Sequence, residues 1–524
     1  MKLVILVAAV ATIAAAPAHD LVTDSLPGFP PAPYPFKLYS GFLNVSGPVA
    51  GYDSLVIHYQ FHESMSAPAT DPVVAWHTGG PGGSSLYGQW AETGYFQVAK
   101  EGTYVNAASA WNNIANTLFL ESPAGAFLTP DALHSGFSYC LKGGERQQRC
   151  SWNDVTQAEA YEATLKAWFA AFPEHAGKDL YLAGESYAGQ YIPNIAAKLL
   201  NGTLAPQLKG IAVGNGCWGG AADSVLCNGP NEARDLLELY HGKGLISTEL
   251  YGRARAACAF PDLPYTATTP PKLSRECKKL IGDPDTGEAG EVDTAVGPLN
   301  PYSVYDDCED PAAAALAAEG GKSPRWLAAV ARTQPGRAAA LFNAPPTTAQ
   351  AQAQAARRRS MVEFSGGYTW SCGTFDSLPK YFERPEVRKA LNLPAVSRGS
   401  TFEYDTSGPA SVTLYPQLIN KIRVLIYNGD ADTVVPYLGN EEWTSGVAKQ
   451  AGFEVAAASH PWFHASRPNR PAGSATAYKR PGADADESPS FNFVTLRLAG
   501  HEVPHFEPEA AFAMISRFLT DKPW

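Results

Sequence analysis

A serine between small residues is the first candidate for chemistry in this chain. Ser186 stands in a Gly-Glu-Ser-Tyr-Ala-Gly run at 184–189, between a strand-like segment at 179–183 and a helix-like segment at 190–200. A tight strand-to-helix turn tolerates only small neighbours and lifts the serine hydroxyl above the edge of the sheet. The run predicts a nucleophile elbow. Similar strings also occur in ordinary turns, so the partners of the serine decide the assignment.

Two later strand-like segments each end in a glycine that is followed by a titratable side chain. One continues as Asn-Gly-Asp-Ala-Asp at 428–432, and the other as Gly-His-Glu-Val-Pro at 500–504. An imidazole can take the proton of a serine, and a carboxylate fixes the imidazole tautomer and stabilises its charged form. Serine, aspartate and histidine in this order, each beyond a strand, indicate an α/β-hydrolase triad. The spacing leaves four candidates for the last two roles: Asp430, Asp432, His501 and His505.

A glycine-rich loop supplies a fourth part of such a site. Residues 77–85 are His-Thr-Gly-Gly-Pro-Gly-Gly-Ser-Ser, directly after an apolar segment at 73–76. Successive glycines let backbone N–H groups turn toward a developing oxyanion. One of them forms an oxyanion hole together with the N–H of the residue after the serine. No lysine follows in P-loop spacing, so a nucleotide site is not expected.

The elements that position these motifs alternate between apolar strands and longer helices. The segment 55–61 alternates like a half-buried strand, whereas 73–76 is continuously apolar, as in a strand covered on both faces. Asn153 or Asp154 caps a helix predicted to reach Phe172. Its apolar stripe comprises Val155, Ala158, Tyr161, Leu165, Trp168, Phe169 and Phe172. The order predicts an α/β-hydrolase fold with a mostly parallel central sheet, helices on both faces and an inserted cap region.

The 524-residue chain divides into four expected segments. Residues 1–18, with one lysine, a short apolar run and Ala-Pro-Ala, are typical of a secretory signal peptide. The first part of the hydrolase core is expected at 19–215 and the second part at 369–524. Between them, cysteines, turn residues and an alanine-rich part indicate an inserted cap and linker at 216–368. An arginine triplet at 357–359 is interpreted as a solvated helix face rather than a processing site.

Cysteine count and charge narrow the class of protein. Eight cysteines, an even number, suit an oxidising compartment, and pairing in sequence order predicts 140–150, 217–227, 258–277 and 308–372. The chain has no zinc-type cluster, so neither a metal nor a cofactor is expected. The net charge of −11 disfavours nucleic acid, and no segment after the leader is long and apolar enough to suggest a membrane helix. Sequons at Asn44 and Asn201 are candidate glycan sites.

With these motifs in place, the chain from about Leu38 to the C-terminus resembles the serine carboxypeptidase family of the carboxypeptidase Y and cathepsin A type. A Leu-Phe-Leu-Glu-Ser-Pro-Ala-Gly run at 118–125 adds to the resemblance. The resemblance implies an extracellular, lysosomal or vacuolar hydrolase. Such an enzyme releases C-terminal amino acids from peptides and proteins at acid pH through an acyl-enzyme. The oligomeric state stays open.

The resemblance also implies residue roles. The triad falls on Ser186, Asp432 and His501, and the oxyanion N–H groups fall on Gly80 and Tyr187. The substrate's terminal carboxylate would be held by three residues: Thr78, Glu92 and Glu185. Two close carboxyls can share a proton, and a protonated carboxyl can donate to a substrate carboxylate. Substrate binding should therefore weaken as the pH rises.

Three departures from the family pattern affect the function. Thr78 stands where the family has asparagine, and it offers one donor where an amide offers two. Glu502 replaces a bulky apolar residue after the histidine, and it predicts a preference for basic leaving residues. Residues 126–135 form a stretch that most members lack.

The first departure keeps a second function open. Plant relatives that transfer acyl groups from glucose esters often carry threonine at the position of Thr78, but they tend to have aspartate before the serine, where this chain has Glu185. Carboxypeptidase is therefore the favoured function and acyltransferase the alternative. The intact triad disfavours a non-catalytic binding role.

Overall fold

A computed structural model of the chain describes most of the sequence. The described residues are 16–99, 102–128, 136–219, 227–306 without 285, 287 and 298, 374–395, 399–407, 410–482 and 490–524. Most of the expected signal peptide, the 308–372 cysteine pair and the arginine triplet lie outside them. No helix within the described ranges combines the length and the apolar character that crossing a bilayer requires.

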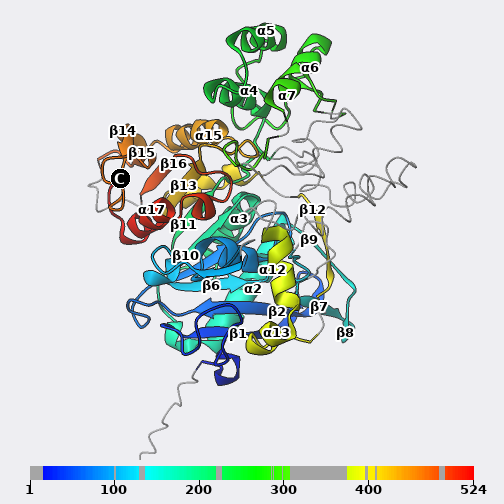
Figure 1. Cartoon of the computed structure of the whole chain (residues 1–524), viewed down its shortest axis with the longest axis vertical. Helices are drawn as coiled ribbons and strands as arrows, with labels where there is room; N and C mark the ends of the chain where they lie inside the picture. Colours follow the sequence, from blue (N-terminus) through cyan, green and yellow to red (C-terminus); the bar gives the residue numbers. More distant parts are fainter. Residues whose placement is uncertain are drawn as a thin grey trace, which may run out of the picture.

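One large mixed sheet organises the described chain (Figure 1). Its order is β14-β15-β16-β13-β11-β10-β3-β6-β2-β7-β8, and β1 pairs with β2. The bounds are β1 Leu38–Val49, β2 Tyr52–His62, β3 Val73–His77, β6 Asn116–Leu120, β7 Tyr139–Lys142, β8 Glu145–Arg146, β10 Leu180–Glu185, β11 Leu208–Gly214, β13 Arg423–Gly429, β14 Glu454–Trp462, β15 Gly473–Lys479 and β16 Phe491–Leu496. From β6 through β3, β10, β11 and β13 to β16 every pair is parallel, and antiparallel pairs flank this run. The predicted fold class is confirmed.

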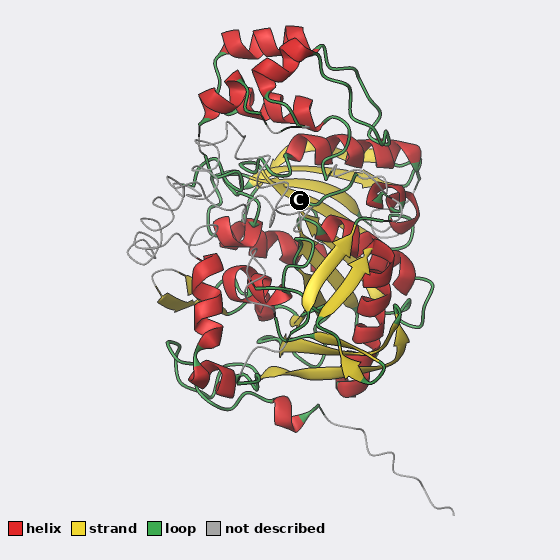
Figure 2. Cartoon of the chain, turned by 90° about the vertical axis from the view of Figure 1, so that its right-hand side faces the viewer, coloured by secondary structure: helices red, strands yellow, loops and turns green. Residues whose placement is uncertain are grey.

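Helices cover both faces of the parallel strands (Figure 2). On one face, α2 (Asp154–Ala171), α3 (Ala188–Leu199) and α15 (Tyr437–Gln450) pack in one hydrophobic cluster with side chains such as Ile426. On the other face, α17 (Pro508–Thr520) packs with side chains such as Leu425. Because neighbouring residues of a strand face opposite sides, a continuously apolar strand is what this burial requires.

Two details of the sequence prediction are wrong. The strand at 55–61 is not half-buried, since β2 is buried from Leu55 to His62. Its polar side chains are hydrogen-bonded in the interior; for example, Gln60 accepts from Trp90 Nε1 at 3.0 Å. In α2, whose N-cap is Asn153, the predicted stripe position Val155 is 48% exposed. Val155 lies on the solvent side of this first turn, whereas Asp154 and Gln157 in the same turn are buried.

Four short helices lie together at one end of the molecule, away from the sheet (Figure 1). They are α4 Glu232–Gly242, α5 Thr248–Cys258, α6 Arg275–Ile281 and α7 Glu291–Val296. They share a small hydrophobic cluster of their own. The remaining elements include α1 Ser85–Gly88, the π-helix η2 Gln89–Thr93, α12 Thr374–Glu383, α13 Pro385–Ala390, α14 Tyr415–Leu418 and α16 Val503–Phe506.

Two further strand pairs and three disulfides complete the description. The strand β4 (Phe96–Ala99) pairs with β5 (Gly102–Val105), and β9 (Arg149–Asn153) pairs in parallel with β12 (Thr401–Asp405). The predicted disulfides Cys140–Cys150, Cys217–Cys227 and Cys258–Cys277 are confirmed.

Candidate active site

The carboxyl ends of the parallel strands bring the three reactive motifs to one edge of the sheet. Ser186 follows β10 directly, Asp432 lies three residues beyond β13, and His501 lies five residues beyond β16. These strands are joined through β11 in parallel register. Loops at this edge of an open α/β sheet converge on the usual position of a ligand.

The turn at Ser186 is strained and held from both sides. Its φ is 60°, in the left-handed region, which costs a non-glycine residue on the order of 1–3 kcal/mol. The Ser186 N–H donates to Gly214 O at 3.0 Å, and its carbonyl accepts from Cys217 N at 2.9 Å. A Cβ on Gly184 would lie 2.1 Å from His77 O, and one on Gly79 would lie 2.7 Å from Ser186 Cβ. The small neighbours are therefore required by backbone contact.

Asp432 and His501 form a buried hydrogen-bonded pair. The two atoms Asp432 Oδ2 and His501 Nδ1 are 2.7 Å apart. The carboxylate also accepts from Asn215 Nδ2 at 2.7 Å, Val434 N at 2.7 Å and Val435 N at 3.1 Å. These donors fix the orientation of the carboxyl group, so the imidazole proton stays on Nδ1 and Nε2 is available as a base.

The second nitrogen of His501 is not hydrogen-bonded to Ser186. Nε2 is buried and has no hydrogen-bond partner among the described residues. Catalytic hydrogen bonds are often long before substrate binds and shorten in the complex. Nε2 is thus uncommitted to any other described group and can accept a proton.

The other two sequence candidates have different surroundings. Asp430 forms an ion pair with Lys243 beside helix α4 at 3.1 Å and accepts from Leu498 N at 2.8 Å. His505 Nδ1 donates to the carbonyl of Ala91 at 3.0 Å, inside the π-helix η2. The first links the loop after β13 to the outer helices, and the second fixes η2.

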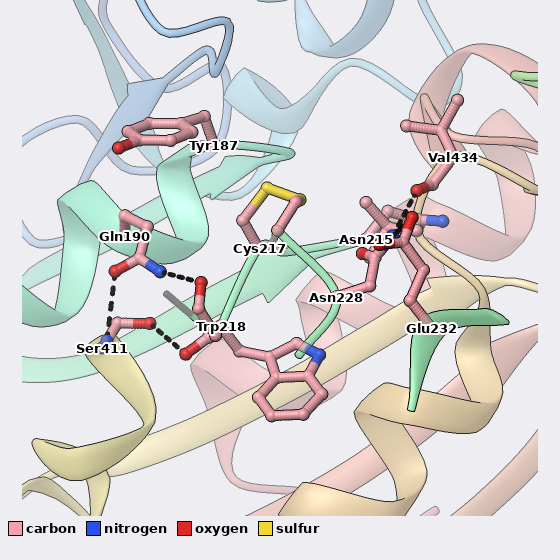
Figure 3. Close-up of a disulfide and its surroundings, with 12 residues drawn as sticks. Tyr187, Gln190, Asn215, Cys217, Trp218, Asn228, Glu232, Ser411 and Val434 are labelled. Carbon is pink, nitrogen blue, oxygen red and sulfur yellow. Dashed lines mark hydrogen bonds between the residues drawn. A yellow bond between two sulfur atoms is a disulfide. The ribbon is translucent and has the colours of Figure 1, made fainter. Parts of the chain in front are cut away.

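A disulfide lies between the turn at Ser186 and the loop after β13 that carries Asp432 (Figure 3). Cys217, whose N–H binds Ser186 O, is bonded to Cys227. The next residue, Asn228, donates through Nδ2 to Val434 O at 2.8 Å, and the N–H of Val434 binds the acid of the pair. The disulfide, with a hydrogen bond at each end, thus connects the two halves of the site.

The glycine loop lies directly against the elbow. A Cβ on Gly79 would be 2.5 Å from Tyr187 N, so the glycine loop is in contact with the residue that follows Ser186. The loop is held by Gly83 N donating to Gly79 O at 2.9 Å and by Phe127 N donating to Gly82 O at 2.8 Å. The N–H groups of Gly80 and Tyr187 have no acceptor within the described part of the chain. Both are therefore free to bind a developing negative charge.

Three buried carboxyls gather beside the elbow. Glu185 ends β10, Glu92 lies on η2 and Glu502 follows the histidine; each is no more than 3% exposed. Burial raises the pKa of Glu92 to about 7. Burial, followed by the charges of Glu92 and Glu502, raises the pKa of Glu185 well above its ordinary value. Glu92 and Glu185 can hydrogen-bond to each other only while one of them is protonated, since two carboxylates offer acceptors alone.

The hydroxyl of Thr78 is oriented by a tryptophan. Trp76 Nε1 donates to Thr78 Oγ1 at 3.0 Å. The oxygen of Thr78 is thereby an acceptor, and its own proton is left to donate elsewhere. Thr78 thus has one hydrogen-bond donor, its hydroxyl, as its residue type implies.

Some residues at the site were missed by the sequence analysis. Asn215, with φ 41°, binds Asp432. A Gly-Asn-Gly run after an apolar strand was the available signal for it. The carbonyl of Tyr302 accepts from His501 N at 2.7 Å, and its ring meets the imidazole edge to face at 5.2 Å. The segment around Tyr302 has no local pattern that predicts this contact.

Comparisons with known proteins agree on one family. A family model described as serine carboxypeptidase matches residues 27–521. The lysosomal protective protein of Mus musculus is 29% identical, with 97% of this chain and 95% of that protein covered. Serine carboxypeptidase-like 21 of Arabidopsis thaliana is also 29% identical, with 96% and 94% covered. The solved structure of Kex1(delta)p, a prohormone-processing carboxypeptidase from Saccharomyces cerevisiae, has the same fold, with a TM-score of 0.61, 20% identity and coverage of 97% and 96%.

Proposed function

The chain belongs to the serine carboxypeptidase family of hydrolases, and on that basis we propose that it releases single amino acids from the C-termini of peptides through an acyl-enzyme on Ser186. The observation that carries the proposal is the buried Glu92–Glu185 pair beside the elbow. A carboxyl pair that keeps a proton can bind a free C-terminal carboxylate, which distinguishes a carboxypeptidase from an endopeptidase.

The proposed reaction uses the His501–Asp432 pair twice. Ser186 Oγ attacks the carbonyl carbon of the last peptide bond while His501 Nε2 takes the hydroxyl proton. The imidazolium is stabilised by Asp432 at 2.7 Å and then gives that proton to the leaving amine as the C–N bond breaks. Water repeats the sequence on the acyl-enzyme, which releases the shortened peptide and restores Ser186.

The tetrahedral oxyanion would bind to the N–H groups of Gly80 and Tyr187. Loss of one donor of this kind costs roughly 10²–10³ in kcat. The contact between Gly79 and Tyr187 N supports this role, because it fixes the glycine loop against the elbow before substrate arrives.

The carboxylate grip gives the reaction a pH dependence of defined sign. Below about pH 7 the pair is protonated, because burial raises the pKa of Glu92 to about 7 and raises that of Glu185 well above its ordinary value. The protonated carboxyl donates to the substrate carboxylate, with the Thr78 hydroxyl as a further donor. As the pH rises through this value Glu92 ionises, so the pair loses a donor and gains a negative charge that repels the substrate carboxylate. We therefore expect kcat/KM to be highest in acid and to fall toward alkaline pH.

Activity that is highest in acid is suited to an acidic location: a compartment of the secretory pathway, the lysosome or vacuole, or an acidic extracellular space. The leader-like residues 1–18, the three disulfides and the similarity to a lysosomal protein support that location.

Thr78 favours one other function, acyl transfer from a glucose ester to an alcohol. Product analysis separates the two. The secreted protein is incubated at acid pH with the blocked dipeptide Z-Phe-Leu and, separately, with a glucose ester of an aromatic acid plus an alcohol. Release of leucine without acyl transfer is the expected result. Transfer without leucine release would replace the carboxypeptidase by the acyltransferase.

Glu502 is proposed to favour basic leaving residues. It is 2% exposed, follows His501 directly and interacts electrostatically with Glu185. A buried carboxylate beside the leaving residue stabilises a cationic side chain. We expect the ratio of arginine release from Z-Phe-Arg to leucine release from Z-Phe-Leu to fall about tenfold in Glu502→Gln, which keeps the size and removes the charge. An unchanged ratio in a folded variant would contradict the assignment.

A further inference from the structure

Asp154 is a buried carboxyl near the elbow that the mechanism above does not use. It is the first residue of α2 and is 5% exposed. Its Oδ1 accepts from the hydroxyls of Tyr404 at 2.7 Å and Tyr187 at 3.1 Å, and its Oδ2 accepts from Ser407 N at 2.9 Å. Tyr404 belongs to β12, which reaches this position by pairing with β9 just before α2. The carboxylate therefore joins the start of α2 to two distant segments, residues 404–407 and the turn after Ser186.

One arm of this network ends in an oxyanion donor. Tyr187 contributes its backbone N–H to the proposed hole, and its side-chain hydroxyl donates to Asp154. Its ring is 5% exposed and packs edge to face on Tyr191 at 5.1 Å and on Tyr404 at 5.6 Å. The residue is thus anchored at the end opposite to its N–H.

The second arm ends in the glycine loop. Gly82 N donates to the Tyr191 hydroxyl at 3.1 Å, and the ring of Tyr191 packs edge to face on the ring of Tyr404 at 5.8 Å. Burial raises the pKa of all three tyrosine hydroxyls well above the ordinary value, so they remain donors across the working pH range. Gly82 lies two residues after Gly80, the other oxyanion donor.

We propose that Asp154 is a positioning residue for the oxyanion hole, acting through Tyr187 on one side and through Tyr404 and Tyr191 on the other. The inference rests on the proposed acyl-enzyme chemistry at Ser186. One carboxylate holds both halves of the hole in place before substrate binds, and donors fixed in advance need no reorganisation in the transition state. A shift of about 1 Å in such a donor can lower the rate on the order of 10²-fold.

The test compares Asp154→Asn, Tyr404→Phe and Tyr187→Phe with a matched control, Tyr161→Phe. The Tyr161 hydroxyl is buried and has no hydrogen-bond partner among the described residues, so its removal changes volume equally and leaves the network intact. Each protein is assayed with an ester and with its thiono analogue, in which sulfur replaces the carbonyl oxygen. Active sites are counted with a phosphonofluoridate. An oxyanion-hole defect lowers ester turnover more than thiono-ester turnover, since sulfur accepts hydrogen bonds weakly.

We expect kcat for the ester to fall about tenfold per titrated site in the three network variants, with KM within about twofold and a reduced ester-to-thiono-ester ratio. Tyr161→Phe should match the parent protein. Parental kcat and ratio in folded Tyr404→Phe and Tyr187→Phe would overturn the inference, even if Asp154→Asn failed to fold. A lower number of titrated sites with normal turnover per site would also overturn it, by assigning the network a purely structural role. A parent protein that does not react with the phosphonate would instead refute the acyl-enzyme itself.

Discussion

Ser186→Ala is expected to lower kcat by about 10⁵–10⁶-fold while leaving the fold intact. Alanine keeps the Cβ of the serine, which already packs beside Gly79, and removes only the attacking oxygen. A φ of 60° costs alanine about as much as it costs serine. The free energy of unfolding should therefore change by less than about 1 kcal/mol. Progress curves on Z-Phe-Leu and thermal unfolding measure the two quantities.

The loss should also abolish labelling by a phosphonofluoridate, since the reagent reacts with the serine oxygen. A folded Ser186→Ala protein with turnover within about tenfold of the parent would refute the nucleophile assignment.

Asp432→Asn is expected to lower kcat about 10⁴-fold, whereas Asp430→Asn should stay within a few-fold of the parent. The Asp432 carboxylate accepts from His501, Asn215 and two backbone N–H groups. An amide offers one acceptor oxygen and turns an NH₂ toward a donor, so the imidazole tautomer is no longer fixed and a buried group loses its partner. Unfolding free energy should fall by about 1–3 kcal/mol as well.

Asp430→Asn is the matched control, with the same chemical change two residues away. It breaks the ion pair with Lys243 and keeps an oxygen for Leu498 N. Steady-state kinetics on both variants decide between the aspartates. Equal losses in the two variants, or a larger loss in Asp430→Asn, would contradict the geometry described for His501.

Much of the fold could be predicted because its information is local. The parallel strands are short apolar runs, and the three reactive motifs follow β10, β13 and β16 in chain order. The N-cap at Asn153 and the three confirmed disulfides follow from neighbours in sequence. By contrast, the choice between Asp430 and Asp432 depends on the backbone conformation of the turn after β13. The Asp-Ala-Asp spacing by itself is compatible with either residue.

The remaining features depend on contacts between distant segments. The β9–β12 pair joins residues 149–153 to residues 401–405, and no local pattern reports such a pairing. The polar residues of β2 alternate with apolar ones, as they would on an exposed face. Their burial therefore becomes visible only in the folded structure, where other segments pack on them. Glu92 lies on a single π-helical turn, a geometry that has no strong sequence signal but is frequent at functional sites.

The departure at Thr78 is explained in part by its neighbour. The indole of Trp76 donates to the threonine oxygen, which commits that oxygen as an acceptor and leaves the hydroxyl proton to donate. The chain therefore keeps one of the two donors that an asparagine would offer. We expect a weaker grip on the carboxylate than an amide gives, with the glutamate pair as its main component.

The central claim is that Glu92 and Glu185 recognise a free C-terminal carboxylate, and one comparison tests it most directly. The kcat/KM for Z-Phe-Leu is measured beside that for the amide Z-Phe-Leu-NH₂ from about pH 5 to pH 8, in the parent protein and in the Glu92→Gln/Glu185→Gln variant. The account predicts a strong preference of the parent for the free acid at low pH. That preference should decline as the pH rises through the Glu92 pKa of about 7, whereas the variant, whose amide donors do not titrate, should be nearly flat. Equal rates for acid and amide at low pH, or a parental pH profile in the variant, would contradict the account.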